Sequence, residues 1–277
     1  MKQEWIDEVL RMCRRKADLY SGCRKIIRPR TVVFHDLWDD EDPLVLEDCG
    51  YTKNKIGHLT RGYLHIESIK AAIMLWNLRR KKTSYGSAGF TTYNHFVKND
   101  IEKKSKRASV MGPCIQSVTL TQIKGGKNAV YAIDVFYRTT ELLKKFPADL
   151  IFIRDVLLKD FDFSGMEFLG MTCHFANVTV HPMYFVTLIP HLDDPLAELE
   201  RIKKKDRYFY DWIVKWTARY VCDEHHRGIA KFAQALRVKM DADKRIKGRR
   251  RRELIQYLRD NHPGHNNDYV DPDGDDE

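Results

Sequence analysis

Two neighbouring runs of β-branched and aromatic residues constrain the fold more than any other feature of the sequence. They extend from Ile115 to Ile123 and from Ala129 to Tyr137, and the five residues between them include two glycines. Such runs, joined across a short glycine-bearing connection, are typical of a β-hairpin, because the runs favour extended backbone and glycine permits the turn. The sequence therefore predicts an antiparallel pair of strands near the middle of the chain.

Helical patterns lie on both sides of this hairpin. Apolar side chains recur there at three- and four-residue intervals, which is the spacing of one helix face. The spacing also predicts that five side chains of the segment DRYFYDWIVKWTARYV point inward, namely Tyr208, Trp212, Ile213, Trp216 and Tyr220. Pro147 is expected to end one helix and to precede another. We expect helices at residues 3–20, 63–80, 139–146, 148–158 and about 195–258.

The remaining segments are expected to be short strands and loops. Residues 31–34 and 168–180 have strand character, whereas residues 36–60 are rich in Asp, Gly, Pro and Asn and indicate a loop. Residues 83–94 contain Gly and Ser and are also expected to be a loop. Together these patterns predict an α+β protein whose C-terminal third is helical.

Charge is distributed unevenly along the chain. The 48 Lys and Arg residues against 39 Asp and Glu residues give a net charge of +9. Because residues 262–277 contain six acids and no Lys or Arg, residues 1–261 carry 48 − 33 = +15. A body this basic favours partners that carry phosphate. We predict one domain over residues 1–261, followed by a disordered acidic tail at 262–277.

The chain is expected to be a soluble, cytoplasmic protein without membrane contact. Its first residues alternate apolar and charged side chains and offer no hydrophobic stretch for a signal peptide. The apolar runs are far shorter than the roughly 20 residues of a membrane span. The six cysteines form no CxxC pair, which favours reduced thiols. His225 and His226 would point in different directions on a helix, so no metal site is expected.

Cys114 is the candidate nucleophile of the sequence. No Walker loop, GxGxxG, HExxH or GxSxG motif occurs in the chain. Cys114 follows Met-Gly-Pro and precedes a predicted strand, where a nearby cation would lower the pKa of the thiol and populate the thiolate. The alternative is a chemically inert core cysteine.

The order of elements after Cys114 resembles the thymidylate synthase superfamily. Pro113-Cys114 is followed by the hairpin, by Tyr137-Arg138-Thr139-Thr140-Glu141 and by Pro147-Ala148-Asp149. The resemblance implies a mixed β-sheet flanked by helices and a nucleophilic Cys114. It also implies that Arg138 binds phosphate, that Thr139 and Glu141 line the substrate site, and that Asp149 reads the base.

Further segments extend the resemblance over about residues 60–182. Lys106 and Arg107 resemble arginines that reach the phosphate across a dimer interface, which implies a homodimer. Asn177 and Thr179 occupy the positions of the family's sugar-binding His and Tyr. Glu67 is the one acid on the helix at 63–80, and the resemblance makes it the candidate for the acid that assists cofactor breakdown.

The function that the resemblance implies is one-carbon transfer to carbon 5 of a pyrimidine nucleotide monophosphate. Asp149 accepts a hydrogen bond from the cytosine amino group and, when protonated, donates one to N3, so we predict a cytidylate hydroxymethylase that uses 5,10-methylenetetrahydrofolate. One alternative is a methylase that acts on uridylate. Another is a nucleic-acid-binding protein with a degenerate site, which the Arg249–Arg252 run would suit.

Overall fold

The computed structural model describes residues 2–38, 66–79, 85–91, 114–125 and 128–222, and residues 252–254, 256, 257 and 260. The chain forms two compact units. The first, here named the sheet unit, comprises Met1–Glu8, Ile27–Leu46 and Tyr51–Thr179. The second, here named the helical unit, comprises Val9–Ile26, Glu47–Gly50 and Val180–Glu277.

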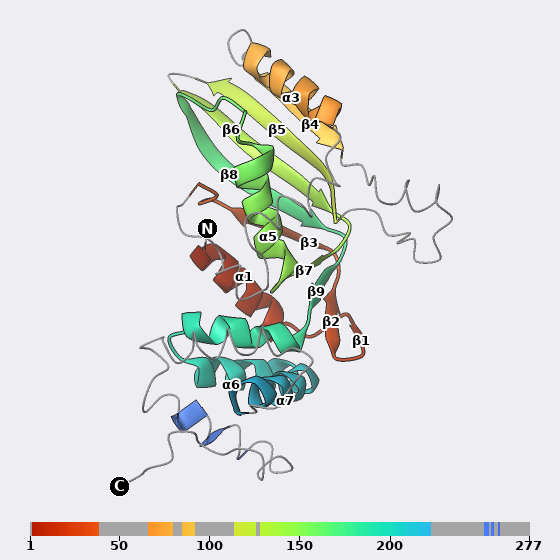
Figure 1. The fold of residues 1–277 in the computed structure, drawn as a ribbon, viewed down its shortest axis with the longest axis vertical. Coiled ribbons are helices and arrows are strands. Elements are labelled where there is room, and N and C mark those ends of the chain that lie inside the picture. The colour runs from red at the N-terminus through yellow and green to blue at the C-terminus, as the bar shows by residue number, and fades with distance from the viewer. Residues whose placement is uncertain are drawn as a thin grey trace, which may run out of the picture. The chain divides into compact units, whose positions relative to one another are not determined.

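A five-stranded mixed sheet forms the centre of the sheet unit. Its strand order is β3-β8-β6-β5-β4, and β6 runs parallel to β8 while every other neighbouring pair is antiparallel (Figure 1). The predicted hairpin is confirmed, because β5 and β6 pair in antiparallel register along their length. The strands are β3 (Arg30–Phe34), β4 (Tyr85–Thr91), β5 (Ile115–Gly125), β6 (Asn128–Tyr137) and β8 (Met166–Phe175).

Two helices cover one face of this sheet. Tyr131 and Tyr137 lie on the same face of β6, because side chains alternate along a strand. The ring centroids of Tyr131 and of Trp76 in α3 (Ile66–Arg79) lie 6.3 Å apart. Those of Tyr137 and of Phe146 in α5 (Lys145–Phe152) lie 5.6 Å apart. The α3 and α5 helices therefore share this face with the buried apolar side chains of the strands.

A bulge in β8 depends on a glycine. Tyr131 pairs with Phe168 and Ala132 with Gly170, so Leu169 is the extra residue. Gly170 has a φ of +145°, and a Cβ there would lie 3.2 Å from the carbonyl oxygen of Phe34. The conformation and the close approach both require glycine at this position.

The described strands and helices of the helical unit come from two distant parts of the sequence. An antiparallel hairpin of β1 (Leu19–Ser21) and β2 (Arg24–Ile27) lies between α1 (Lys2–Arg14) and β3. A 3₁₀ segment, η3 (Pro182–His191), and two helices, α6 (Pro195–Lys205) and α7 (Arg207–Cys222), come later. The α1 helix begins in the sheet unit and ends in the helical unit. In the sheet unit, the short strand β7 (Thr140–Glu141) pairs in parallel with the start of β9 (Val178–Val180).

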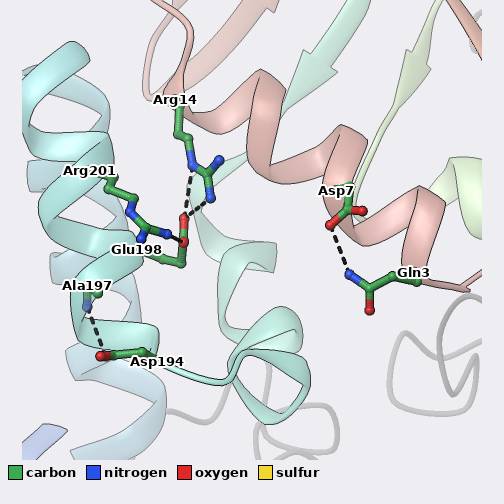
Figure 2. A network of polar contacts seen from close by, with 7 residues as sticks. All are labelled: Gln3, Asp7, Arg14, Asp194, Ala197, Glu198 and Arg201. Carbon is green, nitrogen blue, oxygen red and sulfur yellow. Dashed lines mark hydrogen bonds and ion pairs between the residues drawn. The ribbon is translucent and has the colours of Figure 1, made fainter.

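Charged side chains connect the elements of the helical unit. Figure 2 shows Arg14 and Arg201 directed at the carboxylate of Glu198, which lies 2.9 Å from Nε of Arg14. At the start of α6, the carboxylate of Asp194 accepts the backbone N–H of Ala197 at 3.0 Å. Asp194 thereby caps the helix, as an acidic residue before a proline is expected to do.

A buried lysine forms the second polar network of the helical unit. Lys25 is 0% exposed, and its Nζ lies 2.9 Å from both the carboxylate of Asp206 and the carbonyl oxygen of Cys13. The ammonium also lies 4.7 Å from the ring centroid of Phe209. The hydroxyl of Tyr20 donates to the same carboxylate. Both charged groups of this ion pair therefore have a second partner: the ammonium of Lys25 contacts the carbonyl oxygen of Cys13, and the carboxylate of Asp206 accepts from Tyr20.

Two predictions near the hairpin are wrong. Residues 83–94 were expected to be a loop, but Tyr85–Thr91 forms the edge strand β4, whose pairing with β5 outweighs the low strand preference of its glycines. The helix expected at 139–146 does not form, because Thr140–Glu141 is a strand and α5 begins at Lys145. Pro147 is the third residue of α5, where its missing N–H is not needed.

Two helical predictions are wrong in detail. The first helix ends at Arg14 instead of residue 20, because the chain enters the β1–β2 hairpin. In α7 the buried face is shifted: Tyr208 is 48% exposed, whereas Phe209 and Tyr210 are buried with Ile213. Trp212 and Trp216 are half-buried, and the side chain of Tyr220 lies outside the description. The helix at 63–80 and the strands at 31–34 and 168–180 are confirmed by α3, β3, β8 and β9.

Several predictions concern residues that lie outside those the structure describes. They are the greater part of the loop at 36–60, the His225-His226 pair, the basic run up to residue 251 and the acidic tail at 262–277. Among the helices that are described, none combines the length and apolar character needed to cross a membrane.

Candidate functional site

Backbone hydrogen bonds bring three distant segments of the sheet unit together. The N–H of Arg138 donates to the carbonyl oxygen of Cys114 at 2.9 Å, and the N–H of Ala176 donates to that of Tyr137 at 2.9 Å. The N–H of Thr140 donates to the carbonyl oxygen of Asn177 at 3.3 Å. The entrance of β5, the end of β6 and the link between β8 and β9 therefore form one connected corner of the unit.

The thiol of Cys114 is half-buried at this corner. Burial raises its pKa, and the negative charge of Asp149 acts in the same direction. The cations Lys145 and Arg138 lower the pKa, but by less than burial raises it. The expected net lowering is therefore wrong for the ligand-free protein, although the cations that the sequence argument required are present.

Asp149 contributes a buried carboxyl to the same corner. It lies on α5, is 8% exposed, and has a pKa raised to about 7 by burial. Lys145 and the hydroxyl of Thr140, which lies 3.4 Å from the carboxylate, oppose this shift. Near pH 7 the carboxyl is therefore divided between its neutral and its ionised forms.

Two polar atoms at this corner are buried and have no hydrogen-bond partner within the part of the chain that the structure describes. They are the hydroxyl oxygen of Tyr137 and the side-chain oxygen Oδ1 of Asn177. Buried polar groups in native proteins are nearly always paired with protein or water. The two atoms provide hydrogen-bonding capacity that a polar ligand could use.

Three other predicted site residues lie in this region, and their substrate roles stay predictions. The carboxylate of Glu141 accepts the backbone N–H of Lys144 at 2.6 Å, so it supports the turn before α5. The hydroxyl of Thr179 donates to the carbonyl oxygen of Thr140 at 3.0 Å and ties β9 to β7. Thr139 is half-buried next to Arg138. Glu141 and Thr179 therefore serve the local structure of the corner.

Three predicted residues are not placed. Glu67 belongs to α3, but the structure does not describe its side chain. Lys106 and Arg107 lie in the segment 92–113, which is not among the described residues. Their assigned roles stay predictions.

Two residues outside the predicted set also belong to the site. Lys145 affects both Cys114 and Asp149, and Tyr137 carries the unpaired hydroxyl. A signal for Lys145 was available, because a residue four positions before Asp149 lies on the same face of a helix. Tyr137 resembled an ordinary core residue of a strand, and the sequence alone gave no indication of its unpaired hydroxyl.

Within the described residues, no group of three or more His, Cys, Asp or Glu side chains is arranged to hold a metal ion. Comparison of the chain with protein-family models and with curated proteins finds no match.

Proposed function

We propose that this chain is a homodimeric member of the thymidylate synthase superfamily that modifies carbon 5 of a pyrimidine nucleotide 5′-monophosphate, with cytosine preferred. One observation carries the proposal. A half-buried thiol, two cations and a buried carboxyl act on one another at the start of β5, the end of β6 and the first turns of α5. This set supplies a nucleophile, positive charge for a phosphate and a group that can read a base edge.

Cys114 is the nucleophile of the proposed reaction. Its thiolate adds to C6 of the pyrimidine, and the electrons of the C5–C6 double bond move into the ring toward C5 and N3. C5 then bonds to an electrophile and loses its original hydrogen as a proton, and departure of the thiolate restores the double bond. When the electrophile is a proton from water, the net result is exchange of the C5 hydrogen.

Because burial raises the pKa of the Cys114 thiol, the proposed reaction needs positive charge close to the sulfur. Lys145 and Arg138 provide it in the ligand-free protein. In the proposal Arg138 also contacts the nucleotide phosphate, together with Lys106 and Arg107 of the partner subunit. A fixed guanidinium would orient the ring over the sulfur and lower the entropic cost of the addition.

Asp149 is compatible with cytosine, the base that the resemblance implies. A neutral carboxyl donates its O–H to N3 of cytosine and accepts from the exocyclic amino group, which satisfies both groups at once. The raised pKa, about 7, keeps a large fraction of the carboxyl neutral at physiological pH. By exchanging the roles of its two oxygens, the same neutral carboxyl can pair with O4 and N3–H of uracil. Methylation of uridylate is therefore the second candidate.

The one-carbon donor rests on the resemblance alone. When bound, 5,10-methylenetetrahydrofolate would supply an electrophilic methylene group, and water would complete a hydroxymethyl product. Glu67, the acid that the resemblance assigns to cofactor breakdown, has its side chain outside the described residues. The described residues therefore give no observation that fits a folate, and no step above depends on one.

The addition step can be tested without a one-carbon donor. Wild-type protein should release tritium from C5-labelled cytidylate into water, and Cys114→Ala should abolish the release because no thiolate can add to C6. Cys23→Ala removes a half-buried thiol of the helical unit and is the matched control. Exchange that persists in Cys114→Ala would contradict the mechanism.

Base preference is tested by a scan of cytidine and uridine mono- and triphosphates. Faster exchange with cytidylate supports the assignment of Asp149, and faster exchange with uridylate favours the second candidate. Asp149→Asn should move the preference toward uridylate, because an amide donates to O4 and accepts from N3–H. Absence of exchange with every nucleotide would refute the proposed function.

A further inference from the structure

The hydroxyl of Tyr137 is a buried polar group of the sheet unit that no contact described above explains. Tyr137 is 2% exposed, and its hydroxyl oxygen has no hydrogen-bond partner among the described residues. Burying a hydroxyl without a partner costs stability, since the bond to water is lost and nothing replaces it. A native protein that retains such a group has a use for it or fills the position with a ligand or a water molecule.

Aromatic packing fixes the position of this hydroxyl. The ring of Tyr137 lies 4.8 Å from that of Phe175 at an angle of 29°, and 5.6 Å from that of Phe146 at 73°. Asp149 follows Phe146 by three residues on α5, and therefore lies on the same face of the helix. The hydroxyl is consequently held between the sheet and the helix face that carries the candidate base-reading carboxyl.

Electrostatic coupling agrees with this position. Burial raises the pKa of Tyr137 well above its ordinary value, and the charges of Cys173, Asp149 and Cys114 add to the shift in that order. The phenol is therefore a neutral donor at physiological pH, and Asp149 and Cys114 are among the groups whose ionisation affects it.

A second tyrosine on the same strand provides an internal comparison. Tyr131 lies six residues earlier on the same face of β6 and is 3% exposed. Burial raises the pKa of Tyr131 to about 12, and the neighbouring indole of Trp38 opposes the shift. The two tyrosines share strand, face and burial, and Tyr131 therefore serves as the reference for a buried tyrosine outside the candidate site.

We propose that the hydroxyl of Tyr137 donates a hydrogen bond to the C2 carbonyl oxygen of the bound pyrimidine. This inference rests on the proposed function and names a substrate-binding group that the resemblance does not supply. The C2 carbonyl is adjacent to N3, the atom assigned to Asp149, and it is an acceptor that cytosine and uracil share. Addition of the thiolate to C6 moves negative charge toward N3 and the C2 oxygen, so the bond strengthens as the reaction proceeds.

The first test compares the stability of Tyr137→Phe and Tyr131→Phe without ligand. Tyr137→Phe should be as stable as wild type or more stable, because it removes an unpaired buried hydroxyl. Tyr131→Phe removes a tyrosine hydroxyl from the same face of β6 and is the matched control. A clear loss of stability in Tyr137→Phe would show that the Tyr137 hydroxyl has a structural partner, and would overturn the inference.

The second test measures binding of cytidylate and of its 2-thio analogue, in which a weak sulfur acceptor replaces the oxygen. We expect Tyr137→Phe to bind cytidylate about tenfold more weakly than wild type does, the effect of losing one hydrogen bond. Wild type should bind the 2-thio analogue about tenfold more weakly than cytidylate, whereas Tyr137→Phe should bind the two ligands equally. Equal discrimination by both proteins would overturn the inference.

C5 exchange by wild type separates failure of the inference from failure of the proposed function. If wild type exchanges the C5 hydrogen and Tyr137→Phe shows unchanged affinity and rate, the donor assignment is wrong and the proposed function stands. If wild type neither binds nor exchanges any pyrimidine nucleotide, the proposed function is wrong and the donor assignment is overturned with it.

Discussion

Asp149→Asn should stabilise the folded protein at neutral and alkaline pH, although it removes a group assigned to the substrate. Burial raises the pKa of Asp149 in the folded protein from 3.8 to about 7. Between these pH values the folded carboxyl keeps a proton that the unfolded carboxyl has lost. Raising the pH through this window therefore favours the unfolded state, which binds fewer protons. The penalty is complete above about pH 7 and vanishes below about pH 3.8.

The size of the effect follows from this interval. At roughly 1.4 kcal/mol per pH unit, the full penalty is about 4 kcal/mol. Asparagine does not titrate, so the variant lacks the penalty but keeps a buried amide, which costs about 1–3 kcal/mol if its hydrogen bonds are incomplete. The net gain at pH 8 is therefore about 1–3 kcal/mol. The difference between variant and wild type should grow by about 2–3 kcal/mol between pH 5 and pH 8.

Urea denaturation at pH 5, 6.5 and 8 measures this difference directly. Asp160→Asn removes the charge of an exposed carboxylate and controls for the change in net charge. A free-energy difference between Asp149→Asn and wild type that stays constant from pH 5 to pH 8 would refute the reasoning. The same would follow if the variant were less stable than wild type at pH 8, since the carboxylate would then be stabilised and not penalised by its surroundings.

Two further predictions concern lysines. Lys145→Gln should raise the pKa of the Cys114 thiol further, because it removes the cation that lowers that pKa most. The pH dependence of alkylation, followed by mass spectrometry of the peptide that contains Cys114, measures this pKa. An equal shift in Lys144→Gln would contradict the prediction. Lys25→Met should cost about 3–5 kcal/mol in urea denaturation, because it leaves a buried carboxylate without its cation. Lys203→Met, which breaks a more exposed pair with a 3.3 Å contact, should cost no more than about 1 kcal/mol, and equal losses would disprove the distinction.

The strands and helices that were predicted correctly are those whose side chains alone decide the structure. Residues 115–123 and 129–137 are rich in β-branched and aromatic side chains, and they form β5 and β6. The strand β4 escaped prediction because Gly86 and Gly89 are poor strand formers, and its pairing depends on a partner about 30 residues away. Pro147 was read as a helix stop, but its position in the first turn depends on where the preceding strand ends.

For the candidate site, the sequence was informative about residue types and uninformative about energies. The thiol, the arginine and the carboxyl were selected from their order in the chain, and the structure brings Cys114, Arg138 and Asp149 into one electrostatic cluster. The direction of the thiol pKa was wrong because burial depends on packing that no local pattern reveals. The role of Lys145 and the unpaired hydroxyl of Tyr137 depend likewise on tertiary contacts.

The parallel pairing of β6 with β8 has a consequence for synthesis of the chain. About 28 residues separate the two strands, and that connection carries Arg138 and Asp149. A ribosome therefore completes the β5–β6 hairpin, with its thiol, well before the strand that covers the second edge of β6. During that interval the bare edge of β6 is a template for pairing with other chains. Efficient production of this protein should accordingly depend on how quickly residues 166–175 emerge and dock.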